Sequence, residues 1–251
     1  MGQNPAFYVT PTSGVLELLY SSRHQYSTSL EFKAQDSELM KKGWLGFCKS
    51  GLNGFYNNIT DKPYIIDKSR GWGVNYDFLN TFIDSPKIIC MVRDVRSIYS
   101  SMEKNFRKNP EISKQLINWS TGENSTVERR IETWSTTVPV GLAFTRLKEM
   151  FNLNIYNNIL FIRYEDLTIN PKHEINKIYD YLGLPNFTHN FDEIKQITVE
   201  DDSLYGPYGD HKIKLKIEPY KTDYNKILGP KLSEQIFNSY EWYNDYFNYN
   251  L

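Results

Sequence analysis

Two side chains suited to binding a phosphate, Arg93 and Ser101, lie eight residues apart in the segment KIICMVRDVRSIYSS at residues 87–101. An apolar run ends at Arg93-Asp94, and a helical pattern begins at once. A buried strand that ends here places a guanidinium at the sheet edge, and the next helix points its free N–H groups the same way. Arginine offers a planar fork of donors that matches phosphate oxygens, and the Ser101 hydroxyl can reach the same oxygens. The pattern predicts a phosphate-bearing ligand. The alternative is that Arg93 forms an ion pair at the sheet edge and that Ser101 is an ordinary helix residue, neither of which binds a ligand.

Lys68 stands at the end of another apolar run, in IIDKSRGW at residues 65–72. The carboxyl ends of strands in open α/β sheets are where ligands bind. An ammonium at this place can neutralise negative charge on a leaving phosphate. Arg70 and Trp72 follow and can line the same crevice. The alternative is a surface Lys–Asp pair beside a tryptophan that covers the core.

A third candidate segment is FIRYEDLTINP at residues 161–171. Tyr164 at the end of the apolar run can stack on a base or sugar. For Glu165 and Asp166 we favour a structural role in holding the loop. His24 and His211 stay open as acid–base candidates, whereas the contexts of the other two histidines indicate surface positions.

The elements that must position these side chains follow a strand–helix alternation. Apolar runs that do not alternate with polar residues predict buried strands of a parallel sheet. We expect strands at 64–67, 87–92 and 158–163, and helices at 76–83, 96–108, 127–151 (broken near Pro139), 172–182 and 231–247. This order predicts an α/β fold with βαβ units. The length of 251 residues allows one large α/β domain or two small ones, and the family resemblance described below implies a single domain over residues 1–251.

Two C-terminal patterns carry alternatives. A stripe of Ile236, Tyr240, Tyr243 and Phe247 at helical spacing indicates core packing rather than a binding face. The segment HKIKLKI at 211–217 alternates strictly, so as a strand it would gather three lysines on one face. We interpret it as an edge strand protected by its lysines, with a basic stripe over a polyanionic ligand as the alternative.

Composition narrows the classes of function. The chain has 251 residues, 40% of them hydrophobic, and a net charge of −1, which supports a packed core and argues against a general nucleic-acid binder. No apolar run approaches the ~20 residues needed to cross a bilayer. Two cysteines, Cys48 and Cys90, form no disulfide framework and indicate a reducing, cytoplasmic setting. We find no metal-ligand motif and expect no metal.

Taken together, these segments resemble the sulfotransferase family over roughly residues 1–200. MVRDVRSIYSS resembles the segment in which an arginine and a serine eight residues later hold the 3′-phosphate of 3′-phosphoadenosine 5′-phosphosulfate (PAPS), here Arg93 and Ser101. FIRYEDLTINPKHEINKIYDYLGLP resembles a later block in which a tyrosine, here Tyr164, lies near the adenine. IIDKSRGW is similar to the segment with a lysine near the transferred sulfuryl group, here Lys68. Within the family, the sequence resembles the protein-tyrosine and bacterial or phage-encoded branch most.

The resemblance implies a three-layer, P-loop-like parallel sheet flanked by helices, with one departure. The family opens with a strand and a Pro-Arg-Ser-Gly-Thr-like loop that binds the 5′-phosphosulfate. Here FYVTPT at residues 7–12 resembles the piece after the first helix, so we expect that strand and loop to be missing. Some relatives place a glutamate base near the position of Thr12, where this chain has no carboxylate. Glu17 is close in sequence, but we leave the base unassigned.

The implied function is transfer of a sulfuryl group from PAPS to a hydroxyl or amine of a small-molecule, carbohydrate or peptidyl acceptor, with Lys68 as the catalytic cation. One rival is a P-loop kinase-like phosphotransferase, which needs a Walker lysine that the sequence lacks. The other is a catalytically dead relic that still binds adenosine 3′,5′-bisphosphate.

Overall fold

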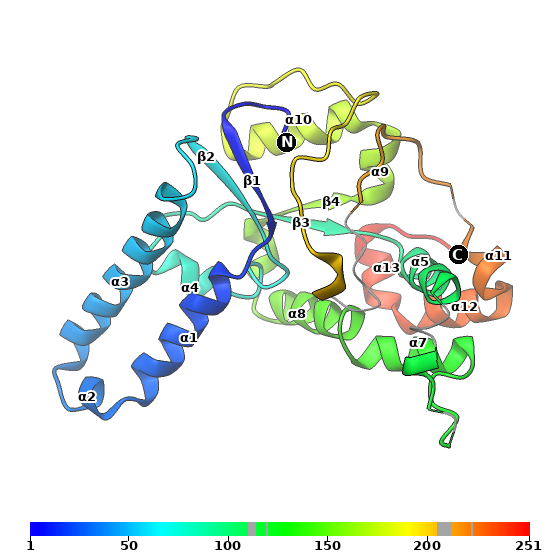
Figure 1. Cartoon of the computed structure of the whole chain (residues 1–251), viewed down its shortest axis with the longest axis horizontal. Helices are drawn as coiled ribbons and strands as arrows, with labels where there is room; N and C mark the ends of the chain where they lie inside the picture. Colours follow the sequence, from blue (N-terminus) through cyan, green and yellow to red (C-terminus); the bar gives the residue numbers. More distant parts are fainter. Residues whose placement is uncertain (110–113, 119, 205–211, 222) are drawn as a thin grey trace.

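Within the described residues, four strands lie at the centre of the molecule in two parallel pairs (Figure 1). The computed structural model describes residues 1–109, 114–118, 120–204, 212–221 and 223–251. Strand β1 (Phe7–Thr12) pairs with β2 (Tyr64–Lys68), and β3 (Ile88–Val92) pairs with β4 (Ile159–Arg163). The three predicted strands are confirmed to within one residue at each end, whereas β1 was not predicted.

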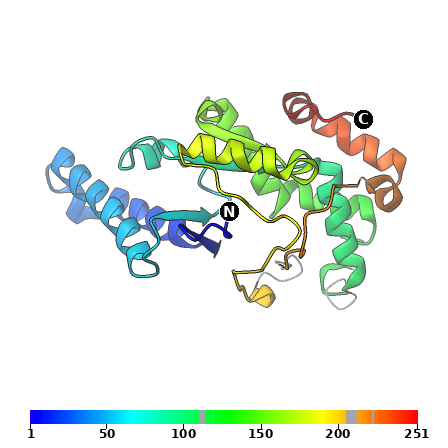
Figure 2. The same cartoon turned by 90° about the horizontal axis from the view of Figure 1, so that it is seen from above.

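Helices flank both pairs of strands. The N-terminal helices α1 (Val15–Thr28), α2 (Leu30–Lys33) and α3 (Ser37–Asn57) form an arm at one end of the molecule (Figure 2). The other helices are α4 (Tyr76–Asn80), α5 (Val95–Lys108), α7 (Val127–Thr136), α8 (Val140–Asn152), η1 (Ile155–Asn158), α9 (Tyr164–Ile169), α10 (Pro171–Leu182), α11 (Tyr224–Leu228), α12 (Pro230–Ser239) and α13 (Glu241–Phe247). The predicted break near Pro139 is confirmed, because α7 ends before it and α8 begins after it.

The expected α/β class, with parallel strands between helices, is confirmed. The strands nevertheless form two pairs instead of one continuous sheet, and within the described residues each strand pairs along one edge. The apolar run of β2 predicts burial on both faces, yet Tyr64 and Ile65 are 41% and 37% exposed. In β3, Met91 is 50% exposed. Strand β2 is therefore covered less completely than its sequence indicates.

In the part of the chain that the structure describes, the core consists of two apolar clusters. The larger one gathers residues of α5, α7, α8, α12 and α13, and it includes the predicted C-terminal stripe of Ile236, Tyr240, Tyr243 and Phe247. That stripe is confirmed as core, although the expected single helix is divided at Tyr240, whose φ of −124° and ψ of 36° separate α12 from α13. The smaller cluster joins Phe7 of β1 to β4 and α10.

The prediction of a strand at 211–217 is wrong for the described residues 212–217, while His211 lies outside the described residues. This stretch is irregular and makes two backbone hydrogen bonds, Ile194 N–H to Leu215 O at 2.6 Å and Ile217 N–H to Phe191 O at 2.9 Å. Leu215 is 77% exposed, so its apolar side chain has no face to cover.

Cys48 and Cys90 are unpaired, as expected. In the part of the chain that is described, no helix is long and apolar enough to cross a membrane.

A buried ion pair fixes α5 against α7. The Glu103 side chain is fully buried, and its carboxylate accepts two hydrogen bonds from Arg130, at 2.8 Å from Nε and 2.7 Å from Nη2. Arg107 Nε donates to the same carboxylate at 2.6 Å. The Arg130 guanidinium also lies 4.1 Å from the ring centroid of Phe106. Each charge is therefore compensated inside the core.

We expect Glu103→Gln to lower the free energy of unfolding by about 3–5 kcal/mol, because it leaves the Arg130 guanidinium buried without a charge partner. Urea denaturation at pH 7 measures this loss. Glu132→Gln makes the same chemical change at an exposed position of α7 and should stay within about 0.5 kcal/mol of the parent protein. Equal stability of the two variants would contradict the assignment.

Candidate functional site

The turn from β3 into α5 is closed by a capped helix start. The Asp94 side chain accepts a hydrogen bond from the backbone N–H of Arg96 at 2.9 Å, which confirms the predicted N-cap. The same carboxylate pairs with the Arg96 guanidinium at 2.7 Å, and both side chains are buried. Arg96 also donates to the backbone carbonyl of Asn250 at 2.5 Å. The start of α5 is thus tied to the C-terminal end of the chain.

Side chains from distant elements hold the backbone on either side of this turn. The Tyr243 hydroxyl donates to Arg93 O at 2.8 Å and accepts from Arg93 N–H at 3.1 Å. Glu165 accepts from the Asp94 N–H at 3.1 Å through one oxygen and from the Tyr249 hydroxyl at 3.1 Å through the other. Glu165 thus has a structural role, but it braces the turn from β3 into α5, because its own segment forms α9 (Tyr164–Ile169) instead of the expected loop. Burial raises the pKa of Tyr243, which keeps its hydroxyl protonated and able to donate.

The Arg93 guanidinium packs against two tyrosine rings. Its central carbon is 4.6 Å from the ring centroid of Tyr164 and 5.1 Å from that of Tyr220. The two rings meet edge to face at 5.9 Å, and the Tyr220 hydroxyl hydrogen-bonds to the Ser97 hydroxyl. Burial raises the pKa of Tyr220, against the lowering effect of Ser97 and Arg93. Among the described residues, the buried Nε of Arg93 has no hydrogen-bond partner. We call Arg93, Tyr164 and Tyr220 the arginine–tyrosine cluster.

The structure thus brings Arg93 and Tyr164 together, and it places Ser101 nearby on α5. Ser97 and Ser101 are one helical turn apart and share a face of α5. Ser97 is buried under Tyr220, whereas Ser101 is exposed. The exposed Ser101 hydroxyl, one turn from the Ser97 that hydrogen-bonds to Tyr220, is open to a ligand that extends from Arg93 along the helix.

Lys68 belongs to the other pair of strands, as the last residue of β2. Its ammonium lies 3.2 Å from the carboxylate of Glu200, and the two side chains are 53% and 5% exposed. The neighbouring Asp67 instead accepts hydrogen bonds from the Tyr56 hydroxyl and the Trp72 indole N–H. The Lys–Asp surface pair considered for this segment therefore does not form, although Trp72 does pack against the core.

Glu200 also reaches the end of β1. Burial alone would raise its pKa, but hydrogen bonds from the hydroxyl and backbone N–H of Thr12, together with Lys68, lower the pKa to about 2. The sequence showed no carboxylate near Thr12, because Glu200 is far along the chain. The fold brings it there.

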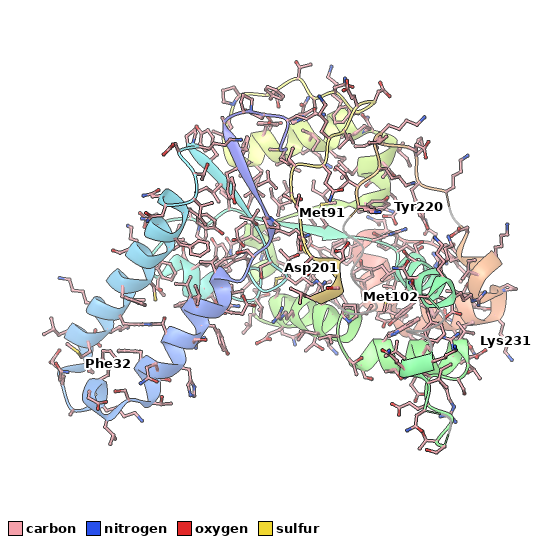
Figure 3. The ribbon with its side chains drawn as sticks, in the orientation of Figure 1. Phe32, Met91, Met102, Asp201, Tyr220 and Lys231 are labelled. Carbon is pink, nitrogen blue, oxygen red and sulfur yellow. The ribbon has the colours of Figure 1, made fainter. Side chains whose placement is uncertain are left out.

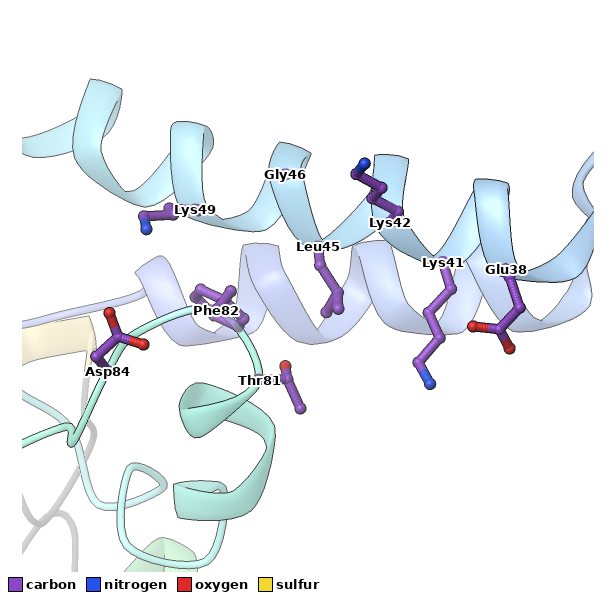
Figure 4. Close-up of a pocket in the computed structure, with 9 residues that line it drawn as sticks. All are labelled: Glu38, Lys41, Lys42, Leu45, Gly46, Lys49, Thr81, Phe82 and Asp84. Carbon is purple, nitrogen blue, oxygen red and sulfur yellow. The ribbon is translucent and has the colours of Figure 1, made fainter.

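One surface hollow of about 420 Å³ lies elsewhere, between α3 and residues 81–84 (Figure 4). Lys41, Lys42 and Lys49 line it together with Glu38 and Asp84. It contains none of the predicted site residues.

Within the described residues, no cluster of three or more histidine, cysteine or acidic side chains is arranged to hold a metal ion.

Comparison with known proteins identifies the family. The sulfotransferase domain family matches residues 19–208, more than half of the chain, so this chain belongs to the sulfotransferase family, a family of transferases. Carbohydrate sulfotransferase 1 of Mus musculus is 28% identical over 145 residues, which cover 53% of this chain and 32% of the relative. Carbohydrate sulfotransferase 1 of Rattus norvegicus gives the same identity and coverage. The match thus spans about a third of these relatives' length.

One similar solved structure is the sulfotransferase domain from the curacin biosynthetic pathway. It covers 92% of this chain and 81% of its own, with 14% sequence identity. Its TM-score of 0.34 is too low to establish a shared fold.

Sequence reasoning missed Tyr220 and Glu200. Tyr220 lies in an irregular segment, and its link to Thr168, whose hydroxyl accepts from the Tyr220 N–H at 3.1 Å, spans 52 residues. Figure 3 labels Tyr220 and also Asp201, the neighbour of Glu200. No local spacing marks either residue. The sequence shows only that Tyr220 is aromatic and that Glu200 is acidic, and neither property alone predicts a site.

We expect Tyr243→Phe to cost about 1–3 kcal/mol of stability, because it leaves the N–H and C=O of Arg93 without their shared partner. The ring and its packing stay. Tyr246→Phe on the same helix is the matched control, since the Tyr246 side chain is 46% exposed and its ring contacts are kept. Urea unfolding of both variants provides the comparison, and a Tyr243→Phe protein as stable as the control would refute the bracing role.

Proposed function

We propose that this chain is a sulfotransferase that uses PAPS as donor and transfers its sulfuryl group to a hydroxyl or amine acceptor. The observation that carries the proposal is the arginine–tyrosine cluster. A guanidinium with a free, buried Nε lies beside two aromatic faces at the start of a capped helix. This combination fits an adenosine that carries a phosphate, because the guanidinium matches phosphate oxygens and the rings match the base or sugar.

In this proposal Arg93 and Ser101 hold the 3′-phosphate, and Tyr164 lies near the adenine. Tyr220 is an additional binding residue, since its ring also packs against the Arg93 guanidinium. The turn from β3 into α5 is fixed by Tyr243 and Glu165 before any ligand arrives. Little ordering of the chain is then needed on binding, which favours affinity.

Lys68 is the proposed catalytic cation. When bound, the donor supplies an activated sulfuryl group. The acceptor oxygen or nitrogen forms a bond to sulfur as the bond from sulfur to the bridging oxygen breaks. The acceptor gives its proton to a base, which we leave unassigned. Lys68 stabilises the negative charge that develops on this oxygen. Positioning by Arg93 and charge neutralisation by Lys68 supply most of the catalysis, as in phosphoryl transfer. No step requires a metal ion.

A carbohydrate hydroxyl is the acceptor class to test first. The mouse and rat relatives are named carbohydrate sulfotransferases, and they match 53% of this chain. Small phenols and tyrosine peptides are the comparison acceptors, because they present a hydroxyl of much lower pKa.

We expect Arg93→Ala to abolish the thermal stabilisation produced by adenosine 3′,5′-bisphosphate, because the bidentate phosphate contact is lost. The parent protein should gain about 2.7 kcal/mol when the ligand is at one hundred times its Kd. Arg129→Ala removes an exposed arginine of α7 and should leave the shift intact. An unchanged shift in Arg93→Ala, or stabilisation by ATP–Mg²⁺ alone, would contradict the proposal.

We expect Lys68→Ala to lower turnover more than donor binding, because its charge acts mainly on the leaving oxygen. Radiolabelled sulfate transfer from PAPS to a panel of carbohydrates gives kcat, and the thermal shift with adenosine 3′,5′-bisphosphate gives binding. Equal losses in both measurements would make Lys68 a binding residue only.

A further inference from the structure

The end of the β1–β2 pair already holds an anion, and that anion belongs to the chain itself. The Lys68 ammonium lies 3.2 Å from one oxygen of the Glu200 carboxylate, and the hydroxyl and backbone N–H of Thr12 also favour its charged form and lower its pKa. A backbone N–H, a hydroxyl and an ammonium are also the donors that bind phosphate and sulfate oxygens. The carboxylate is nearly inaccessible, with 5% of its side chain exposed, whereas Lys68 is 53% exposed.

The segment that delivers Glu200 has little apolar burial to hold it in place. We call residues 198–204 the strap. Its apolar side chains Val199 and Leu204 are 87% and 82% exposed. Figure 3 marks the strap by its label on Asp201. A segment with few buried apolar contacts opens at low free-energy cost. The contacts of Glu200 with Thr12 and Lys68 are therefore well placed to decide whether the strap is closed.

We propose that Glu200 is an internal competitor: its carboxylate occupies the Thr12–Lys68 donor set, and the strap must release it before a sulfuryl or phosphate group binds there. This inference rests on the proposed function, because it concerns the same Lys68. It adds that Thr12 binds the reacting end of the ligand and that the strap controls access to it.

A different role for Glu200, as the base that takes the acceptor proton, fits the structure less well. With its pKa at about 2, the carboxylate is a weak proton acceptor near neutral pH. The Glu200 carboxylate is also paired with the Lys68 ammonium, and this ion pair stabilises its unprotonated form. A competitor needs a stable negative charge on the donor set, and this is what the contacts provide.

The test uses inorganic pyrophosphate, which carries neither adenine nor ribose and so reports the Thr12–Lys68 donor set apart from the tyrosines. We expect Glu200→Gln to bind pyrophosphate about tenfold more tightly than the parent protein in calorimetric titration, because the amide competes less well for Lys68. The gain should persist in an Arg93→Ala background and disappear in a Lys68→Ala background. Glu193→Gln removes a 68% exposed carboxylate that precedes the strap and should not change the affinity.

Hydrogen exchange on the unmutated protein gives a second readout that needs no variant. Pyrophosphate should speed exchange of the strap amides, because a displaced Glu200 frees the segment. Slower exchange would mean that the strap closes over the ligand, and it would overturn the inference. Unchanged pyrophosphate affinity in Glu200→Gln, or an equal gain in Glu193→Gln, would overturn it as well. A gain that holds while Arg93→Ala keeps its adenosine 3′,5′-bisphosphate shift would refute the proposed function and leave the competitor in place.

Discussion

The arginine–tyrosine cluster depends on one constraint, the satisfaction of the backbone where β3 turns into α5. Buried N–H and C=O groups left without partners cost free energy, and a strand that ends inside the molecule exposes several of them. Tyr243 satisfies both groups of Arg93, and Glu165 satisfies the N–H of Asp94. The Arg93 side chain is therefore not needed to hold the turn, and it can face the tyrosines.

This constraint explains which parts of the molecule could be predicted from sequence. Strands β2, β3 and β4 and the cap at Asp94 are encoded by neighbouring residues, so local patterns identify them. Tyr220 and Glu200 reach their places through contacts that span 123 and 132 residues, to Ser97 and Lys68. Local spacing carries no record of such contacts. The alternating lysines at 212–217 misled for the reverse reason, since alternation produces a strand only where a neighbouring edge and a face to cover exist.

The relative position of Lys68 and Arg93 rests on side-chain packing. The two residues follow different strand pairs, and within the described residues no ladder of hydrogen bonds joins these pairs. Phe7 of β1 packs edge to face on Tyr179 of α10 at 5.9 Å, and Asn4 donates to the hydroxyl of the same tyrosine at 3.0 Å. Such contacts permit small shifts more readily than a shared sheet does. In the proposed site, the distance between Lys68 and Arg93 can therefore change more easily than distances within either pair of strands.

In the function that we propose, the Glu200 carboxylate beside Lys68 also decides which end of the donor can supply net binding energy. A ligand that displaces Glu200 exchanges one charge-assisted contact for another, so its reacting end gains little net affinity. The gain has to come from the far end of the ligand, at Arg93 and its two tyrosines. An anion without the adenosine part then competes poorly with Glu200, which gives selectivity by rejecting the wrong ligand. In the proposed mechanism, binding energy from groups remote from the reacting bond is in this way used to position that bond next to Lys68.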